Sequence, residues 1–457
     1  MKYFLSLFSL ILVTTAAAAK KPNVLVFFID DLGSQDITVN GSTFHETPHI
    51  DKLAANGVNF TNSYSAHPVC SPTRAAMMSG KAPQRVGITQ WIHQPSAIHL
   101  PLTEETIGET FKDAGYSTGY IGKWHIGEKD DQMPSGQGFT WMKAVNRAGQ
   151  PASYFYPYNN KWKGAFWDVP DLQDGKKGDY LTDAVTDKAI GFIEDNKKKP
   201  FLLYISHYAV HTPIQAPAKL VAKYKAKREK LYGNSKTPFK AGRYGVRYRA
   251  RQDQVAYAAM MENLDMNIGR VLKRLDELKL TENTIVVFTS DNGGHPVITS
   301  NKPFKHGKGF NYEGGIRIPT IISWKGKITK AVSDVPIITM DMYPTLLKLA
   351  GIKRKPKQHL DGISITPLLK GRSNKKLKNR FLAWTYPHNH GSGHKPSSAI
   401  RKGNWKLIQF KVGKKYELYN LKQDISEHQD MAETKPEKVK ELSTLLNNWL
   451  KETTPKK

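Results

Sequence analysis

Two polar motifs in this chain have the side chains of a divalent-cation site. Asp30-Asp31 comes directly after a β-prone apolar run, and Asp291-Asn292 follows another such run after one serine. Carboxylate and amide oxygens suit a hard cation, Ca²⁺ or Mg²⁺, better than they suit zinc. Either motif alone could equally cap a helix or form a turn. Because both occur at predicted strand ends, we favour the metal site.

Basic side chains and imidazoles stand in other loops, beside glycine or proline. A bound cation surrounded by such groups would hold a tetrahedral oxyanion and have a proton donor and acceptor at hand. Each of these residues alone is typical of a solvated surface, so the set acquires meaning only if the fold brings it together. The candidates are Arg74, Lys123, His125, His211 and Lys308.

The elements that would position these groups alternate along the chain. Strands that alternate with helices predict an α/β fold in which helices cover a mostly parallel sheet. Several of the polar groups follow the carboxyl end of a predicted strand, where open α/β sheets place their sites. Apolar, β-prone runs cover residues 23–29, 117–122, 201–206 and 284–289, and helical patterns cover 103–113, 180–196 and 254–278.

The pattern changes after about residue 375. Short strand-like runs occupy 381–384, 398–400, 405–410 and 416–419, and a helical pattern runs from about 436 to 451. We therefore predict a smaller C-terminal subdomain, an antiparallel sheet packed with a terminal helix. The expected division is a signal peptide at 1–19, a main catalytic domain at 20–375 and this subdomain at 376–457.

The N-terminus indicates export. Lys2 precedes the apolar run 4–13, and small residues follow up to Ala19, which is typical of a secretory signal peptide. No later stretch is long and apolar enough to predict a transmembrane helix, so we expect a periplasmic or secreted protein without membrane insertion. Cys70 is the only cysteine, which excludes an intramolecular disulfide.

The net charge of +28 across 457 residues indicates a polyanionic partner. Export disfavours nucleic acid, and a sulfated or carboxylated polysaccharide fits better. The alternative is that the excess of lysine only keeps the protein soluble. The basic segment 219–251 is predicted to be an exposed insertion, which either grips a polyanion or forms a solvated flap.

The stretch Cys70-Ser71-Pro72-Thr73-Arg74 resembles the signature of the type I sulfatases. In that family, a formylglycine-generating machinery reads Cys-x-Pro-x-Arg and oxidises the cysteine to formylglycine. Ser79 stands where the family usually has threonine, a departure that puts no role in doubt. Four further stretches resemble family blocks in the same order, namely 23–32, 115–125, 290–294 and 307–319.

The resemblance implies an alkaline-phosphatase-like α/β sandwich and a hydrolase of sulfate esters. One hydroxyl of the hydrated formylglycine would attack sulfur, and the other would then expel sulfate. The implied ligands of Ca²⁺, which the resemblance puts ahead of Mg²⁺, are Asp30, Asp31, Cys70, Asp291 and Asn292. The implied catalytic residues are Cys70, Arg74, Lys123, His125, His211 and Lys308.

The resemblance also implies a division of roles within this catalytic set. The two lysines would neutralise sulfate oxygens, and the arginine would steady residue 70. His125 is the candidate base for the release of sulfate. His211 would protonate the departing sugar oxygen, and it is preferred over His207 because it stands directly before Thr-Pro, as in the family block.

Histidines also suggest where the substrate binds. The loop 386–394 resembles a zinc tract at first sight, but its place beside the second subdomain favours a sugar-binding loop, with a plain surface loop as the alternative. His67 would either contact substrate or cap a turn. The candidate substrate-binding residues are His67, His388, His390 and His394, with Trp91, His93, Trp141 and Arg147 as weaker candidates.

The implied function is that of a bacterial polysaccharide sulfatase, and the C-terminal run 386–408 favours galactose-type sugars. A phosphate or phosphonate monoester hydrolase on the same fold is an alternative, because both anions are tetrahedral. A catalytically inactive polyanion-binding protein is a second alternative, which the complete catalytic set argues against.

Overall fold

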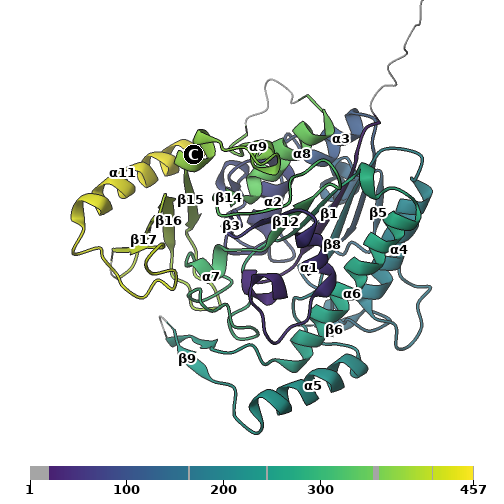
Figure 1. The fold of residues 1–457 in the computed structure, drawn as a ribbon, viewed down its shortest axis with the longest axis horizontal. Helices are drawn as coiled ribbons and strands as arrows, with labels where there is room; N and C mark the ends of the chain where they lie inside the picture. The colour runs from purple at the N-terminus through teal and green to yellow at the C-terminus, as the bar shows by residue number, and fades with distance from the viewer. Residues whose placement is uncertain (1–19, 163–164, 243–244, 354–359, 414, 456–457) are drawn as a thin grey trace, which may run out of the picture.

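The computed structural model describes residues 20–162, 165–242, 245–353, 360–413 and 415–455. The expected signal peptide, 1–19, lies outside the described residues. Within the described part of the chain, every helix is too short or too polar to cross a lipid bilayer. Figure 1 shows a large sheet between layers of helices, with a smaller sheet and the C-terminal helix at one side.

The large sheet is mixed and mostly parallel. β1 pairs in parallel with β8 and β11, and β4 pairs in parallel with β8 and β5, whereas β12 runs antiparallel to β11 and β2. Its eight strands lie in the order β13 (Ala331–Ser333), β2 (Val58–Phe60), β12 (Thr320–Ser323), β11 (Thr284–Ser290), β1 (Asn23–Ile29), β8 (Phe201–His207), β4 (Ser117–Gly122) and β5 (Trp141–Lys143).

Each face of this sheet has its own apolar core. Alternate residues of β1 supply the two cores: Val24 and Phe28 pack on one face, Leu25 and Phe27 on the other. Strands covered on both sides read as continuous apolar runs, which is why these strands were evident in the sequence. The first face is covered by α2 (Cys70–Ser79), α3 (Ile107–Asp113) and α8 (Met342–Ala350), and the second by α1 (Pro48–Ala55), α4 (Leu181–Asp195) and α6 (Val255–Glu277).

The C-terminal strands form a second sheet that is antiparallel throughout. Leu442 and Leu446 of α11 pack against it and bury its outer face. The α/β fold class with an antiparallel C-terminal part and a terminal helix is therefore confirmed. The strands are β15 (Phe381–Tyr386), β16 (Ser397–Lys402), β17 (Trp405–Phe410) and β18 (Tyr416–Asn420), and the helix is α11 (Pro436–Thr453).

The remaining elements are short or peripheral. The basic segment folds into a helix followed by a hairpin, at the lower edge of Figure 1. These elements are α5 (Ala218–Tyr232) with the hairpin β9 (Phe239–Ala241) and β10 (Arg247–Arg249), the pairs β3 (Ser63–Tyr64) with β14 (Ile337–Ile338) and β6 (Asn160–Trp162) with β7 (Ala165–Trp167), and α7 (Glu313–Ile316), α9 (Thr366–Leu369) and α10 (Lys375–Asn379).

A buried ion network joins the C-terminal sheet to α7. The Lys406 ammonium on β17 contacts Glu313 on α7 and Glu427, each at 2.9 Å, and all three side chains are fully buried. The Tyr64 hydroxyl donates to the same Glu313 carboxylate at 2.7 Å. Because α7 begins five residues after Lys308, this network also holds the loop that carries Lys308.

We predict that Lys406→Met destabilises the protein by about 3–5 kcal/mol, because two buried carboxylates lose their shared cation. Urea unfolding followed by circular dichroism measures the change in free energy of unfolding. The matched control is Lys402→Met, which breaks a half-exposed pair with Glu441 and should cost no more than about 1 kcal/mol. Equal losses in the two variants would contradict the prediction.

Candidate functional site

The parallel pairing of β1 and β11 brings the two acidic motifs together. Ile29 lies opposite Ser290, so the residues that follow, Asp30 and Asp291, leave the sheet side by side. The Asp31 backbone N–H donates to the Asp291 carboxylate at 3.1 Å. Asp31 has a φ of 58°, a left-handed conformation that costs a non-glycine residue energy and is enriched at functional sites.

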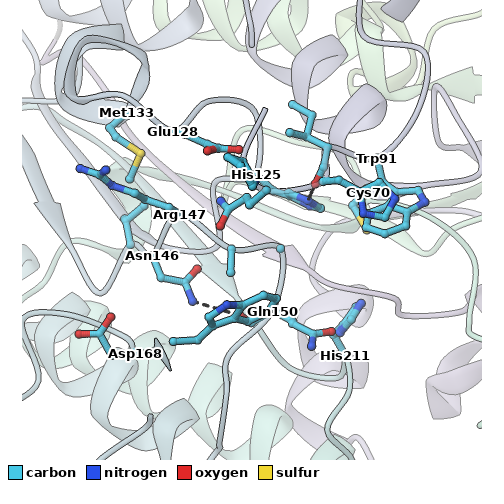
Figure 2. Close-up of a pocket in the computed structure, with 18 of the residues that line it drawn as sticks. Cys70, Trp91, His125, Glu128, Met133, Asn146, Arg147, Gln150, Asp168 and His211 are labelled. Atoms are coloured by element: carbon cyan, nitrogen blue, oxygen red, sulfur yellow. Dashed lines mark hydrogen bonds between the residues drawn. The ribbon is translucent and has the colours of Figure 1, made fainter. Parts of the chain in front are cut away.

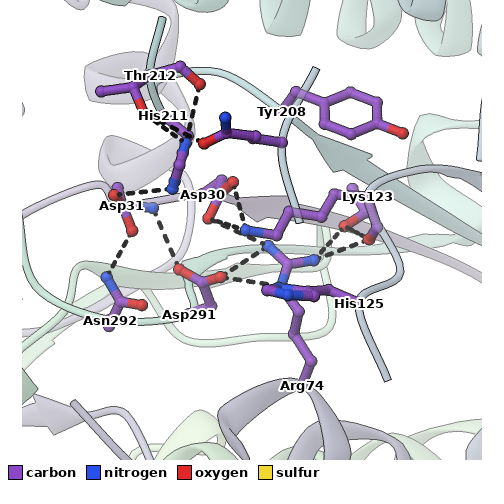
Figure 3. A network of polar contacts seen from close by, with 12 residues as sticks. Asp30, Asp31, Arg74, Lys123, His125, Tyr208, His211, Thr212, Asp291 and Asn292 are labelled. Carbon is purple, nitrogen blue, oxygen red and sulfur yellow. Dashed lines mark hydrogen bonds and ion pairs between the residues drawn. The ribbon is translucent and has the colours of Figure 1, made fainter. Parts of the chain in front are cut away.

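Three buried cations face these three buried carboxylates, and Figure 3 shows two of them, Arg74 and Lys123. The Lys123 ammonium lies 2.7 Å and 2.9 Å from the two oxygens of Asp30. The Lys308 ammonium lies 2.7 Å from Asp31. Arg74 contacts Asp291 through Nε at 2.9 Å and a terminal nitrogen at 2.7 Å. Each carboxylate therefore has its own cation, as burial of charge requires.

The pKa values of the aspartates diverge within this cluster. Burial raises the pKa of Asp30 well above its usual value, against the effect of Lys123, and the neighbouring Asp291 and Asp31 carboxylates raise it further. Burial also raises the pKa of Asp31, but Lys308, His211 and Lys123 together outweigh burial and hold that pKa below the usual range. Crowded carboxylates of this kind favour an additional positive charge.

Cys70 is the first residue of α2, and its side chain lies beside the carboxylates. Arg74 comes one helical turn later, on the same face, so the four-residue spacing aligns the two side chains. Every residue of α2 is buried, and the helix ends at Gly80, whose φ of 69° a larger residue would rarely adopt. Burial raises the pKa of the Cys70 thiol to about 11, so an unmodified thiol is a poor nucleophile at neutral pH.

The donor atoms fit a hard divalent cation. Ligand atoms of Asp30, Cys70 and Asp291 lie within 4.8 Å of one another, as do those of Asp31, Cys70 and His211. Asn292 donates through Nδ2 to Asp31 at 2.8 Å, while its buried Oδ1 has no hydrogen-bond partner among the described residues. Oxygen donors of this number and type suit Ca²⁺.

His125 is held as a neutral proton acceptor. Its Nε2 lies 2.9 Å from the Ile92 carbonyl oxygen, and because a carbonyl only accepts, Nε2 carries the hydrogen. The buried Nδ1 is then a lone pair, with no hydrogen-bond partner in the described part of the chain. Burial lowers the pKa of His125 well below its usual value, and Lys123 lowers it further. Like Asp31, His125 has a positive φ, 64°.

His211 and His207 occupy different environments. The His211 Nε2 lies 3.6 Å from Asp31, and its Nδ1 lies 2.9 Å from the Thr212 carbonyl. Burial and Lys308 lower the pKa of His211 to about 3 in the absence of a bound anion. His207 ends β8, is 1% exposed and does not line the pocket described next. The geometry therefore favours His211 for contact with a ligand.

A pocket of about 1130 Å³ opens over Cys70 (Figure 2). Cys70, Trp91 and His211 lie towards one side of the view, and Arg147 and Asp168 towards the other. The residues that line it include Cys70, Trp91, His93, His125, Glu128, Asp130, Asn146, Arg147, Gln150, Trp167, Asp168, His211, His295, Lys308 and His390.

The four predicted substrate-binding histidines are not all placed at this pocket. His390 lines it. His388 bonds to Thr89 at 2.9 Å, outside the lining. His67 and His394 are buried against the ring of Tyr386, each with ring centroids 4.8 Å apart; His394 stacks on this ring, and His67 meets it edge-on.

The weaker candidates divide in a similar way. Trp91, His93 and Arg147 line the pocket. Trp141 lies on β5 and packs on Phe192, with ring centroids 5.0 Å apart, so it belongs to the core of the sheet. Most of the lining residues that the sequence did not single out come from irregular loops, namely Glu128, Asn146, Gln150, Asp168 and His295, whereas Trp167 ends β7.

Comparison with known proteins assigns a family. A sequence model described as Sulfatase matches residues 22–352, and one described as N-sulphoglucosamine sulphohydrolase, C-terminal, matches residues 305–456. A Sulfatase of Formosa agariphila is 31% identical over 96% of this chain and 89% of its own length. The N-acetylgalactosamine-6-sulfatase of Homo sapiens is 33% identical over 78% of this chain and 67% of its own length.

Solved structures agree with this assignment. The crystal structure of Ps i-CgsB is 30% identical, with a TM-score of 0.80 over 94% of this chain and 93% of its own. The same protein in complex with k-i-k-neocarrahexaose gives 28% identity and a TM-score of 0.79 over the same shares of each chain. With its family match, its fold and its relatives in agreement, this chain belongs to the sulfatase family and is a sulfuric ester hydrolase.

Proposed function

We propose that this protein hydrolyses a sulfate ester on a sulfated carbohydrate and releases inorganic sulfate, using a formylglycine made from Cys70 and a bound Ca²⁺. The observation that carries the proposal is the position of Cys70, at the start of α2, between the buried carboxylates and the open pocket. A relative whose crystal structure contains neocarrahexaose supports a sulfated sugar as the substrate.

Residue 70 must do what a buried thiol cannot. An aldehyde hydrates to give two hydroxyls on one carbon, so one can attack sulfur while the sugar alcohol leaves. Loss of a proton from the other then breaks the bond to sulfate and restores the aldehyde. Pro72 and Arg74 complete the Cys-x-Pro-x-Arg sequence that a formylglycine-generating partner would read.

Asp30, Asp31, Asp291 and Asn292, with residue 70, would hold the Ca²⁺. When bound, the cation would supply Lewis-acid stabilisation of negative charge at the sulfate oxygens. The ammonium groups of Lys123 and Lys308 would contact the sulfate oxygens in addition to the aspartates, and would neutralise part of the negative charge of the sulfate. Arg74 would remain fixed, because it also donates to the Lys123 carbonyl and to the Ser206 hydroxyl, each at 2.8 Å.

The two histidines would transfer protons in different steps of the reaction. The His125 Nδ1 lone pair would accept the proton whose loss expels sulfate. His211 would donate a proton to the departing sugar oxygen. Its pKa is about 3 without a ligand, because of burial and Lys308, and a bound sulfate next to the ring would raise that pKa towards the range a general acid needs.

We also propose that the N-terminal segment directs export and that the substrate is an extracellular polysaccharide. A galactose-type sugar is the preferred unit, on the strength of the C-terminal run in the sequence. The net charge of +28 would draw the polyanion towards the enzyme over distances beyond direct contact.

Sulfate release tests the proposed function directly. Enzyme from a host with formylglycine-generating machinery should release sulfate from carrageenan, ulvan or chondroitin fragments, measured by ion chromatography. Cys70→Ala should lower the rate at least about 10³-fold, and the peptide carrying residue 70 should show the mass change from thiol to aldehyde. Faster turnover of a matched phosphate ester, or unchanged activity of Cys70→Ala, would contradict the proposal.

The role of His211 predicts a dependence on the leaving group. His211→Ala should lower kcat/KM on sugar sulfates by about 10²–10⁴-fold, because an alkoxide needs a proton to depart. The loss on 4-nitrophenyl sulfate should be much smaller, since nitrophenolate leaves unprotonated. His207→Ala is the control and should leave the ratio of the two rates unchanged. An equal loss on both esters in His211→Ala would refute this role.

The metal site predicts stabilisation by Ca²⁺ that does not depend on turnover. At 100 times its Kd, Ca²⁺ should stabilise the folded protein by about 2.7 kcal/mol, seen as a rise in Tm. Asp291→Asn should abolish the rise, whereas Asp174→Asn, a change at an exposed carboxylate paired with Lys188, should not. A Ca²⁺-induced rise that survives in Asp291→Asn would place the site elsewhere.

A further inference from the structure

The pocket has opposite charges at its two ends. Towards Cys70, the charged lining residue is Lys308. Away from Cys70, the charged residues of the described lining are the carboxylates of Glu128, Asp130 and Asp168 and the guanidinium of Arg147. Arg147 and Asp168 lie towards the other side of Figure 2, and Asp130 pairs with Arg147. That end therefore carries a net negative charge of two, which is unexpected in a protein of net charge +28.

Asn146 presents a hydrogen-bond acceptor of fixed orientation at this end. Its Nδ2 donates to the Gln150 carbonyl oxygen at 3.0 Å, drawn as a dashed line in Figure 2. A carbonyl can only accept, so the other amide atom of Asn146 is the oxygen. The side chain is 6% exposed, and this Oδ1 has no hydrogen-bond partner within the described ranges. A buried acceptor without a donor is unfavourable, so a ligand that brings a donor would be stabilised here.

Glu128 adds a second acceptor of the same kind. One of its carboxylate oxygens is buried and lacks a hydrogen-bond partner in the part of the chain that the structure describes. A backbone hydrogen bond from Ser96 holds the carboxyl group in place. Asp168, at the far side of the pocket, is an exposed carboxylate. We call Glu128, Asn146 and Asp168 the acceptor wall.

The guanidinium at this end offsets the acceptor wall only in part: burial raises the pKa of Glu128, and Arg147 lowers that pKa by less than burial raises it. Arg147 bonds to the Asp130 carboxylate at 3.1 Å, and its side chain is 64% exposed. Solvent screens an exposed pair of this kind, and its own carboxylate already balances the cation. A second anionic group of a ligand would therefore meet acceptors and negative charge rather than a free cation.

We propose that the acceptor wall binds hydroxyl groups of an unsulfated sugar next to the sulfate ester that is cleaved, and that it disfavours a neighbour carrying a second sulfate or a carboxylate. Sulfate and carboxylate oxygens only accept hydrogen bonds, whereas sugar hydroxyls donate. The volume of about 1130 Å³ exceeds the usual range for a single small ligand, so it has room for the neighbouring ring. This inference rests on the proposed function and deepens it.

Binding to a variant that cannot turn over its substrate tests the inference. Calorimetric titration of Cys70→Ala would use neocarrabiose disaccharides with one sulfate and the same disaccharides with an added sulfate on the neighbouring ring. In the tightest-binding pair, the monosulfated sugar should bind roughly tenfold more tightly, as expected for a like-charge contact at partial exposure. An added sulfate that leaves affinity unchanged or raises it, or a lack of binding by every sugar, would overturn the inference.

Two variants in the Cys70→Ala background assign the effect to residues. Glu128→Gln keeps the shape but removes the charge, and should bring the two affinities of the pair close to parity. Asn146→Ala should weaken the monosulfated sugar alone, because only its hydroxyl reaches the acceptor. Asp174→Asn is the control, and unchanged Tm values establish that the variants are folded. If Glu128→Gln and Asn146→Ala both still bind the monosulfated sugar as much more tightly than the disulfated sugar as Cys70→Ala does, the inference is overturned.

Sulfate release by the unsubstituted enzyme separates this result from the proposed function. If no fragment loses sulfate but the monosulfated sugars bind more tightly, the proposed function fails and the acceptor wall stands. If sulfate is released but the added sulfate does not weaken binding, the proposed function stands and the acceptor wall fails.

Discussion

The structure depends on a balance of buried charge at the carboxyl edge of the large sheet. Three carboxylates follow β1 and β11, and none of them could stay ionised there without a cation. Their partners come from separate parts of the chain: Arg74 from α2, Lys123 from the end of β4 and Lys308 from the loop before α7. The buried carboxylates and the buried cations are therefore stable only when these parts of the chain come together.

Backbone geometry makes this convergence possible. Gly293 follows the Asp291 motif, and a Cβ at this position would lie 1.9 Å from the Gly314 carbonyl oxygen in α7. Only glycine permits so close an approach, which brings the loop that carries Lys308 against the aspartates. The buried Lys406 network then fixes α7 from the other side. The strands of the C-terminal sheet supply none of the proposed metal ligands. The sheet nevertheless contributes to the geometry of the site, because it holds α7 in place.

Much of this arrangement could be predicted, because it follows from short-range patterns. Buried parallel strands read as apolar runs, so Asp30 and Asp291 could be assigned to strand ends, and the structure shows that the two strands are neighbours. The pocket wall could not be predicted, because Asn146 lies in an irregular loop and its role depends on contacts formed only after folding. The same limit applies to His67 and His394, whose contacts with the Tyr386 ring form only in the folded chain. Their part in sugar binding stays a prediction.

Net charge and site charge serve different purposes in this protein. The basic segment around α5 is less free than its composition suggests, because Asp253 contacts Arg249 at 2.5 Å and Arg251 at 2.9 Å. The excess of lysine elsewhere acts over long range and attracts any polyanion alike. Discrimination between sugars must then arise where charges are few and fixed, inside the pocket. An acceptor wall beside a cationic sulfate site provides it, because it admits one anion and favours hydroxyls around that anion.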